Sequence, residues 1–363
     1  MNINQDNKWD YFFRRAVDWV FRVKSLPVRL ISLGASLVIA SIGGGFVLGF
    51  SVSSVSNLFQ LNFSFSDAPE FLIFGAFFVG IFLIVVGLIV AVCDYMREAN
   101  RRKVIIIEQR GLRVSPSIPL SSSLKKYKGS RHLISMDIRN KDNEVENPDT
   151  ALSEVVHVNR DVRQRMADTD PNDTSIVYGG LMPVPFTFLT GMLLDDEGDI
   201  DVFDWDRYQK SWRSLNGDDD GDRFQITGLN DISSDVDEVV LALSVSYGVD
   251  LEAIERCFGS IPMLHMELPN GNPSCHWSLV KQQELGREFF ELLVKLKGLG
   301  ISRVHLIVAA PNSVVFNLGR HYDPRNLPSA RIYQYEQSHE VPYPWSVELP
   351  THGKQASIKV TKI

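Results

Sequence analysis

The stretch Val304–Asp323, VHLIVAAPNSVVFNLGRHYD, decides the fold of this chain. Its first six residues predict a buried strand, Pro311-Asn312-Ser313 a tight polar turn, and Val314–Leu318 the start of a helix that Gly319-Arg320 ends. A strand that turns directly into a helix presents unpaired backbone N–H groups to an anion. The stretch has no Lys-Ser/Thr of a P-loop and no Gly-x-Ser-x-Gly elbow. It therefore predicts phosphate binding without cleavage, or an ordinary α/β crossover without a ligand.

A second copy of this pattern lies about 130 residues upstream. Ile176–Leu181 (IVYGGL) aligns with LIVAAP of the first stretch, and Phe188–Asp195 (FLTGMLLD) aligns with its FNLGRHYD, with one gap of two residues. Each copy continues into a short strand, at Ile200–Phe203 and at Arg331–Tyr335. Chance similarity of two α/β units is the alternative. Two Rossmann-like halves facing each other would join the carboxyl ends of their strands in one composite pocket.

The rest of the region alternates strands and helices. Further strands are predicted at His132–Ile138, Glu238–Tyr247 and Met263–Leu268, after a Pro/Ser linker over 114–131. Helical periodicity predicts helices over 150–167 and 281–297. This alternation predicts a parallel α/β sheet with crossover helices.

Two long uncharged segments precede this region. Residues 30–50 (LISLGASLVIASIGGGFVLGF) and 71–93 (FLIFGAFFVGIFLIVVGLIVAVC) contain no Asp, Glu, Lys or Arg. Each is long enough to cross the ~30 Å hydrocarbon core of a bilayer as a helix. We predict two transmembrane helices; a buried helical hairpin of a soluble protein is the alternative. Small residues at four-residue steps predict close packing within one chain or between chains: Ser41, Gly45, Gly49, Ala76, Gly80, Gly87 and Ala91.

Lys and Arg predict how the spans are oriented. Six stand at positions 8–29, six at 97–113, and none in the connecting loop 51–70. The positive-inside rule places both ends of the chain in the cytoplasm and the loop outside. Residues 9–27 mix aromatic and basic side chains at helical spacing, which predicts an interfacial helix that Pro27 ends. A soluble helix packed on the cytoplasmic part is the alternative.

The part of the chain after the second span is acidic. From residue 114 onward it contains 25 Lys and Arg against 36 Asp and Glu. This balance argues against a domain that coats a nucleic-acid polymer. A small phosphate ligand remains compatible with it, because a helix terminus and a few cations can hold one locally.

No metal site or catalytic constellation is predicted. The cysteines show no paired spacing, and Cys275-His276 with nearby Cys257 and His265 fits no common zinc pattern. The run Asp218–Asp222 resembles part of a calcium loop, but the twelfth position of an EF-hand starting at Asn216 is not Glu. We therefore predict a solvated loop there. His305 lies within a strand and is predicted to be a hydrogen-bonded core histidine.

Several of these segments resemble one family. Residues 281–335, with the helix, HLIVAAP, the FNLGR turn and RIYQYE, resemble the C-terminal half of a SAVED domain, and YPWSVEL at 343–349 resembles its closing strand. Residues 132–212 resemble the N-terminal half, so the likeness covers about residues 125–350. It implies two fused CARF-like units that bind a cyclic oligonucleotide in CBASS anti-phage systems. The best-known members carry a nuclease, whereas residues 1–113 here resemble a two-transmembrane effector whose presumed output is membrane disruption.

These observations lead to one expected organisation. We expect an α/β fold in which a two-helix transmembrane hairpin precedes a SAVED domain of two fused CARF-like (Rossmann-like) halves. Residues 1–29 form the interfacial helix, 30–113 the spans and a juxtamembrane linker, and 114–363 the cytoplasmic sensor. The halves of the sensor run over about 125–248 and 249–350.

The expected function is that of a receptor in the bacterial inner membrane. It binds a cyclic di- or trinucleotide, assembles as a homo-oligomer or rearranges, and disrupts the bilayer to cause abortive infection. No catalytic residue, metal, cofactor or DNA or RNA polymer is expected. The alternatives are a membrane scaffold that docks a protein partner through its acidic face, and a membrane-bound enzyme.

Topology places the candidate ligand contacts at strand ends and helix starts. Any one of them alone is also an ordinary turn residue. An aromatic side chain among them can stack on a base. The candidates are Pro311, Asn312 and Ser313; their counterparts Gly179, Gly180 and Met182; and Arg139, Asn140, Asn270, Asn272, Trp205, Tyr335 and Glu336 from the other strand ends.

Overall fold

The computed structural model describes residues 25–42, 47–54, 57–64, 69–112, 116–140, 147–233, 235–337, 339–351 and 353–361. The chain divides into two compact units, Met1–Asn100 and Arg101–Ile363. The interfacial helix predicted over 9–27 lies outside the described residues except at its end. There Pro27 does not end a helix, because it stands in the first turn of α2 (Leu26–Ile42), where its missing N–H leaves no hydrogen bond unmade.

The first unit contains two apolar helices and a hairpin. Helix α3 (Glu70–Arg101) includes the predicted second span, and its segment Phe71–Arg97 is long and apolar enough to cross a bilayer. Helix α2 has 17 residues, about 26 Å at the usual rise, and the chain then forms the antiparallel strands β1 (Val47–Ser54) and β2 (Asn57–Ser64). The helix predicted over 30–50 is therefore wrong at residues 47–50, which belong to β1, while residues 43–46 lie outside the described residues. The sequence has three successive glycines at 43–45, and glycine is a poor helix former.

Helices α2 and α3 pack backbone against backbone. A Cβ added to Gly34 would lie 2.5 Å from the Gly80 carbonyl oxygen, and one added to Gly80 would lie 2.8 Å from that of Gly34. A Cβ added to Gly87 would lie 2.7 Å from Cγ1 of Ile31. Two of the small residues predicted for helix packing, Gly80 and Gly87, thus serve packing within the chain. Large apolar side chains of α3 point outward, as a lipid environment requires: Phe71, Phe74, Phe78, Phe82, Val85, Leu88, Ile89 and Val92.

The second unit contains two sheets. One has the order β4-β3-β5-β6-β7, in which β7 is antiparallel and the others are parallel. The other has the order β14-β13-β12-β11-β9-β10-β8, with parallel strands at its centre and antiparallel strands at both edges. The strands are β3 (Lys103–Arg110), β4 (Ser130–Asp137), β5 (Thr174–Leu181), β6 (Ile200–Asp206), β7 (Ser211–Ser214), β8 (Gln225–Thr227), β9 (Glu238–Ser244), β10 (Met263–Glu267), β11 (Arg303–Ala309), β12 (Ser329–Gln334), β13 (Trp345–Glu348) and β14 (Ser357–Val360). The helices are α4 (Pro148–Val155), α5 (Val158–Met166), α6 (Val184–Leu193), α7 (Leu251–Phe258), α8 (Leu279–Gly298) and α9 (Asn312–Arg320).

The two sheets repeat one topology, and the predicted repeat is confirmed. In each sheet the first parallel strand (β3 or β9) lies between the second (β4 or β10) and the third (β5 or β11), which gives β4-β3-β5-β6-β7 and β10-β9-β11-β12-β13. Strand β5 with helix α6 is the first copy, and β11 with α9 is the second. We call β3–β7 with α4–α6 the first half, and β8–β14 with α7–α9 the second half.

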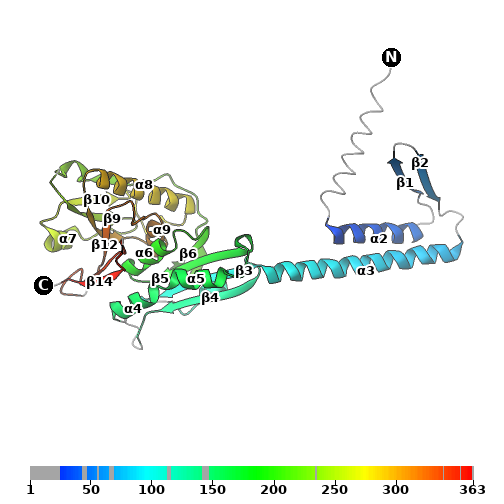
Figure 1. Cartoon of the computed structure of the whole chain (residues 1–363), viewed down its shortest axis with the longest axis horizontal. Coiled ribbons are helices and arrows are strands. Elements are labelled where there is room, and N and C mark those ends of the chain that lie inside the picture. Colours follow the sequence, from blue (N-terminus) through cyan, green and yellow to red (C-terminus); the bar gives the residue numbers. More distant parts are fainter. Residues whose placement is uncertain are drawn as a thin grey trace, which may run out of the picture. The chain divides into compact units, whose positions relative to one another are not determined.

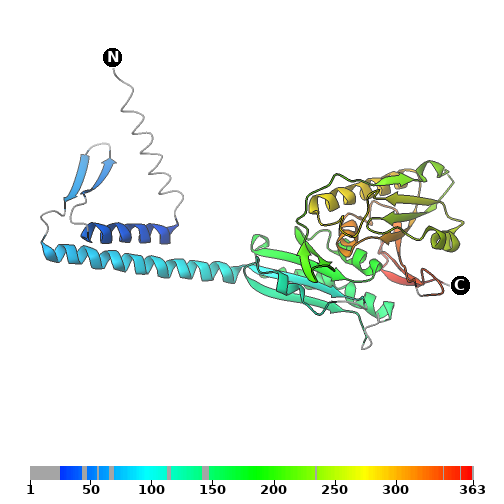
Figure 2. The same ribbon diagram turned by 180° about the vertical axis from the view of Figure 1, so that it is seen from behind.

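Helices α6 and α9 are exchanged between the halves (Figures 1 and 2). Helix α6 packs on β12 and β13, α9 packs on β5 and β6, and the helices contact each other. A Cβ on Gly191 would lie 2.1 Å from the Phe316 carbonyl oxygen, and one on Gly319 would lie 2.2 Å from that of Phe188. The aligned FLTG and FNLG motifs therefore meet at the pseudo-two-fold axis. Phe316 stacks on Tyr178 of β5 with ring centroids 3.8 Å apart.

Two predicted boundaries are wrong. Residues 103–110, assigned to the juxtamembrane linker, form β3, a buried strand between β4 and β5. Strand β9 lies in the second sheet, so the halves separate in the connection after β7 and not near residue 248. The helix predicted over 150–167 is two helices, because the chain leaves the first at Val156 before α5 begins.

Candidate ligand-binding site

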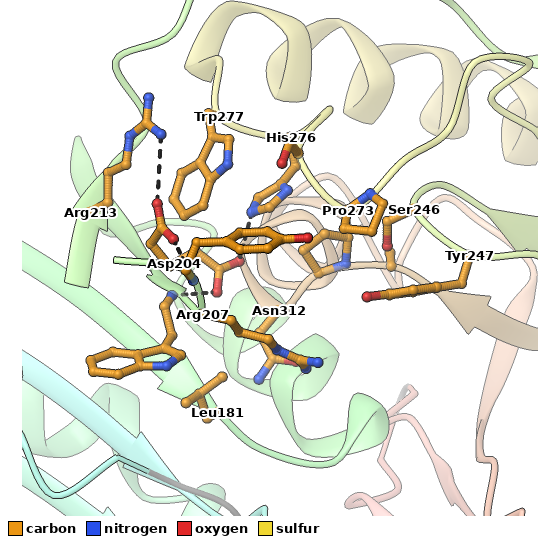
Figure 3. A pocket seen from close by; sticks show the side chains of 16 residues that line it. Leu181, Asp204, Arg207, Arg213, Ser246, Tyr247, Pro273, His276, Trp277 and Asn312 are labelled. Atoms are coloured by element: carbon orange, nitrogen blue, oxygen red, sulfur yellow. Dashed lines mark hydrogen bonds and ion pairs between the residues drawn. The ribbon is translucent and has the colours of Figure 1, made fainter. Parts of the chain in front are cut away.

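A cavity of about 450 Å³ opens where the carboxyl ends of strands from both sheets meet (Figure 3). The first half contributes the ends of β5 and β6 and the start of β7. The second half contributes the ends of β9 and β11 and the loop after β10. The cavity is lined by Leu181, Asp204, Trp205, Asp206, Arg207, Tyr208, Arg213, Ser246, Tyr247, Pro273, Ser274, His276, Trp277, Ala310, Pro311 and Asn312.

Each half caps the exchanged helix of the other. The Ser313 amide at the start of α9 donates to Asp204 Oδ2 at the end of β6, at 3.0 Å. The Val184 amide at the start of α6 donates to Gln334 Oε1 at the end of β12, at 3.2 Å. The Asn312 side chain also donates to the carbonyl of Gly180 at 3.0 Å. The helix start that the sequence offers to an anion thus already binds a carboxylate of the chain itself.

Four polar side chains of the cavity wall are almost fully buried: Asp204, Asp206, Ser246 and His276. His276 Nε2 lies 3.7 Å from Asp204 Oδ2. Burial lowers the pKa of His276 below its usual range, although the Asp204 carboxylate acts in the opposite direction. His276 Nδ1 and Ser246 Oγ have no hydrogen-bond partner among the described residues. Buried polar atoms without a partner are costly, so a ligand atom that pairs with them gains affinity.

Cations and aromatic rings surround these buried groups. Arg207 and Arg213 line the cavity, and the guanidinium carbon of Arg213 lies 4.6 Å from the ring centroid of Trp277. The Arg213 Nη1 atom is 3.8 Å from Asp206 Oδ2, so the guanidinium remains only loosely paired. Trp205 adds a second indole to the wall. The cavity therefore combines cations that suit phosphates with flat apolar faces that suit bases.

The loop that carries His276 and Trp277 is held from two sides. From inside, Gln282 of α8 donates to the His276 carbonyl at 2.6 Å. From outside, the connection between the halves crosses it, and the Gly217 amide donates to the Trp277 carbonyl at 2.7 Å.

The acidic run of this connection is the predicted solvent-exposed loop, and it also forms contacts that the sequence did not indicate. Lys281 Nζ is 2.6 Å from Asp220 Oδ1, and Asn270 Nδ2 donates to Asp222 Oδ1 at 2.9 Å. The Lys281 side chain is 1% exposed, so its buried charge is compensated by the ion pair with Asp220. Asp219 pairs with Arg223 in turn. These contacts clasp the connection to the start of α8.

Three of the sequence-predicted contacts line the cavity: Trp205, Pro311 and Asn312. Ser313 lies beneath it, because it is 1% exposed and its hydroxyl accepts from Gln282. Asn270 and Asn272 belong to the loop after β10 but stand just before its cavity-lining residues.

The other predicted contacts lie elsewhere. Gly179 packs close to Leu120, and the carbonyls of Gly180 and Met182 accept from Asn312. Gly179 therefore serves packing within the first half, whereas Gly180 and Met182 serve the contact between the halves. Four more lie outside the set that lines the cavity: Arg139, Asn140, Tyr335 and Glu336.

Arg139 forms a bidentate ion pair with Asp137, whose pKa is lowered mainly by this hydrogen bond. Tyr335 donates to Asp250 at 3.3 Å, and Glu336 accepts from Trp345. Each of these side chains therefore already has a structural partner.

Sequence reasoning missed Arg207, Arg213 and His276. Arg207 follows β6 in the run DWDRY, whose acidic, aromatic and basic residues were the available signal, and Arg213 lies on β7 of the same hairpin. His276 was considered only as a zinc ligand. In the part of the chain that the structure describes, no group of three or more His, Cys, Asp and Glu is arranged to hold a metal ion. His305 is the predicted core histidine, hydrogen-bonded to Tyr333 and Glu238.

Fold and site together define a two-part protein: a membrane module followed by a double α/β domain with a ligand cavity. Residues 158–349, over half of the chain, match SAVED, the SMODS-associated and fused to various effectors sensor domain. The chain belongs to this family. Residues 6–152 match Saf_2TM, the SAVED-fused 2TM effector domain. No curated protein matches the chain.

The chain is similar to solved structures of SAVED/CARF-domain receptors. The Acinetobacter baumannii Cap4 receptor with the cyclic trinucleotide 2'3'3'-cAAA is 13% identical, with a TM-score of 0.46 over 76% of this chain and 58% of that one. The same receptor with 3'3'3'-cAAA is also 13% identical, with a TM-score of 0.46 over 76% of this chain and 59% of that one. The Moraxella osloensis Cap4 receptor is 13% identical, with a TM-score of 0.42 over 74% of this chain and 56% of that one. The chain thus spans less than two thirds of the length of these receptors.

Proposed function

We propose that this protein is a membrane-anchored receptor that binds a cyclic oligonucleotide in the cavity between its two halves. Membership of a sensor-domain family supports a ligand-binding role. The observation that carries the proposal is the cavity wall, in which the unpaired His276 Nδ1 and Ser246 Oγ stand beside Arg207 and Arg213. Such a wall offers charge to phosphates and two buried polar atoms to a nucleobase.

Each wall residue has a role under this proposal. Arg207 and Arg213 contact phosphates, and the indole of Trp205 stacks on a base. The Asn312 side chain and the Pro311 backbone contact the ligand from the second half. The buried carboxylates of Asp204 and Asp206 are acceptors for exocyclic amines, because a carboxylate only accepts hydrogen bonds.

Titration calorimetry of the full chain in lipid nanodiscs tests this proposal. The panel contains cyclic di- and trinucleotides, among them 2'3'3'-cAAA and 3'3'3'-cAAA, with linear triadenylate for comparison. We expect saturable binding of at least one cyclic ligand. Arg213→Ala should weaken it by about 2 kcal/mol, roughly 30-fold, because a charge-assisted hydrogen bond is lost.

Arg160→Ala is the matched control, since Arg160 is an exposed arginine of α5 outside the cavity wall. It should leave the affinity unchanged. Equal weakening by both substitutions would point to general charge attraction, and absence of binding to every member of the panel would remove the proposal.

The output under this proposal is a change in the membrane. Residues 6–152, which include the first unit from residue 6 onward, match a SAVED-fused 2TM effector domain, and Arg102 alone joins α3 to β3. The ligand favours an assembled or rearranged state of the cytoplasmic halves, which requires that it binds this state more tightly than the free one. The spans of a homo-oligomer in the inner membrane, with both chain ends in the cytoplasm, then perturb the bilayer.

Dye release from proteoliposomes measures this output. The cyclic ligand that binds in nanodiscs should trigger release, and Arg213→Ala should shift the ligand concentration required by the same factor as the binding constant. Gly80→Leu should abolish release without changing ligand affinity, since it separates α2 from α3. Gly75 has no atom within 4 Å of an added Cβ, so Gly75→Leu is its control. Ligand-independent release, equal in all variants, contradicts the proposed coupling.

A further inference from the structure

A second polar hollow lies on the seven-stranded sheet, away from the cavity. It has a volume of about 640 Å³ and lies on the side of the sheet that faces α7. Four cationic side chains line it against one carboxylate, Glu348; these are Arg303, Arg331, Lys354 and Lys359. We call it the basic hollow. A local excess of positive charge is unexpected in a region with more Asp and Glu than Lys and Arg.

The sheet register builds this charge pattern. Arg303 lies on β11, Arg331 on β12 and Lys359 on β14. Glu348 lies on β13, directly opposite Arg331. Residues on four adjacent strands therefore point to the same face. Lys354 is added by the turn between β13 and β14.

The charges of the basic hollow are incompletely neutralised. Arg331 Nη2 is 2.6 Å from Glu348 Oε2, and Arg303 Nη1 is 2.9 Å from Glu238 Oε1. These two carboxylates offset the two arginines. Arg303 Nε is buried without a hydrogen-bond partner, and neither lysine ammonium has a carboxylate within the 4 Å of an ion pair among the described residues. The hollow thus keeps two unpaired ammonium groups and one unsatisfied buried donor.

The basic hollow is separate from the candidate cavity. Strand β11 runs from Arg303 at the hollow to Ala309, the residue before the cavity wall. This length corresponds to roughly 20 Å of extended chain. Among the described residues no aromatic side chain lines the hollow, so these residues offer charge and hydroxyl donors but no face on which a base could stack.

We propose that the basic hollow binds a small anion that carries clustered phosphates. Its volume is in the range of small-molecule sites, and an ammonium pair beside a guanidinium donor suits several phosphate oxygens at once. A free polyphosphate and the headgroup of a phosphorylated lipid share this chemistry. The inference does not depend on cyclic oligonucleotide binding, because no residue is common to the two sites.

Titration calorimetry with sodium tripolyphosphate tests the site on the full chain in zwitterionic nanodiscs. We expect saturable binding that Lys354→Gln/Lys359→Gln weakens roughly tenfold, as expected for the loss of two solvent-exposed charge contacts. Both lysines are exposed, so the unfolding temperature should not change. Lys354→Arg/Lys359→Arg should retain binding.

Two controls make the result specific. Lys295→Gln/Lys297→Gln removes the same charge from the end of α8 and should leave binding intact. Arg213→Ala, in the candidate cavity, should also have no effect. Equal weakening by both lysine pairs, or loss of binding in Arg213→Ala, would each overturn the proposal.

Inositol trisphosphate, the soluble headgroup of a phosphorylated lipid, is the second probe. Binding of tripolyphosphate alone assigns the hollow to a free anion, and binding of inositol trisphosphate alone assigns it to a headgroup. Binding of both, with the same response to the lysine variants, supports recognition of clustered phosphates as such. Binding of neither overturns the proposal.

Discussion

Gly191→Ala should destabilise the second unit strongly, although alanine normally favours a helix. The added Cβ would lie 2.1 Å from the Phe316 carbonyl oxygen and 3.1 Å from the Arg320 nitrogen. Both are backbone atoms that no rotamer change can move, so α6 and α9 must separate by roughly 1 Å to reach ordinary contact. Overpacking of this kind costs about 3 kcal/mol, the upper end of its usual range, against a gain of under ~1 kcal/mol in helix propensity.

The assay is thermal unfolding of the full chain in detergent, followed by tryptophan fluorescence. For a unit of this size the loss corresponds to a decrease of roughly 6–10 °C in Tm. Gly298→Ala in α8 is the control, because nothing lies within 4 Å of its added Cβ, and it should leave Tm unchanged or slightly higher. Gly319→Ala should resemble Gly191→Ala, and the double variant should cost less than the sum, since one separation relieves both clashes. An unchanged Tm for Gly191→Ala would refute the close crossing.

Two further predictions concern the clasp at Lys281 and the cavity wall at His276. Asp220→Asn should lower the free energy of unfolding by about 2–3 kcal/mol, because it leaves the buried Lys281 charge unpaired. Lys281→Met should lower it by under ~1 kcal/mol, since Asp220 is 51% exposed and remains hydrated. Denaturant unfolding measures both values, and equal losses would contradict the clasp. The lowered pKa of His276 means that the unfolded chain binds a proton more readily, so stability should fall as the pH drops below about 6.5, the usual value for histidine. His276→Gln should reduce this slope in Tm against pH without removing it, because His305 also has a lowered pKa through burial; an unchanged slope would contradict a neutral His276 in the folded protein.

Much of the fold could be predicted because its strands are apolar runs bounded by turn residues. The strand and helix of each copy follow from such runs, and the aligned FLTG and FNLG motifs identify the helices that cross. Strand β3 was missed, because its short apolar run VIII follows a membrane helix directly and shows no alternation. Only pairing with β4 and β5 on either side makes it a central strand.

The site could be predicted only as a location. The carboxyl ends of the strands do form the cavity, and Trp205, Pro311 and Asn312 line it. Local sequence cannot show that the Ser313 amide is already bonded to Asp204, since the two are 109 residues apart. The same holds for the clasp between Lys281 and Asp220, which joins the connection between the halves to a helix 61 residues away. Contacts at such separations depend on the completed fold.

The exchange of α6 and α9 has a consequence for recognition. An arrangement in which each half caps the helix of the other is that of a homodimer, yet here both halves belong to one chain and need not be identical. Asp204 and Arg207 at one side of the cavity come from the first half, while His276 and Asn312 come from the second. A dimer of identical chains must present the same groups to both ends of its ligand. This chain presents different ones, so under the proposed function the cavity would distinguish the order in which unlike units follow one another around a cyclic ligand.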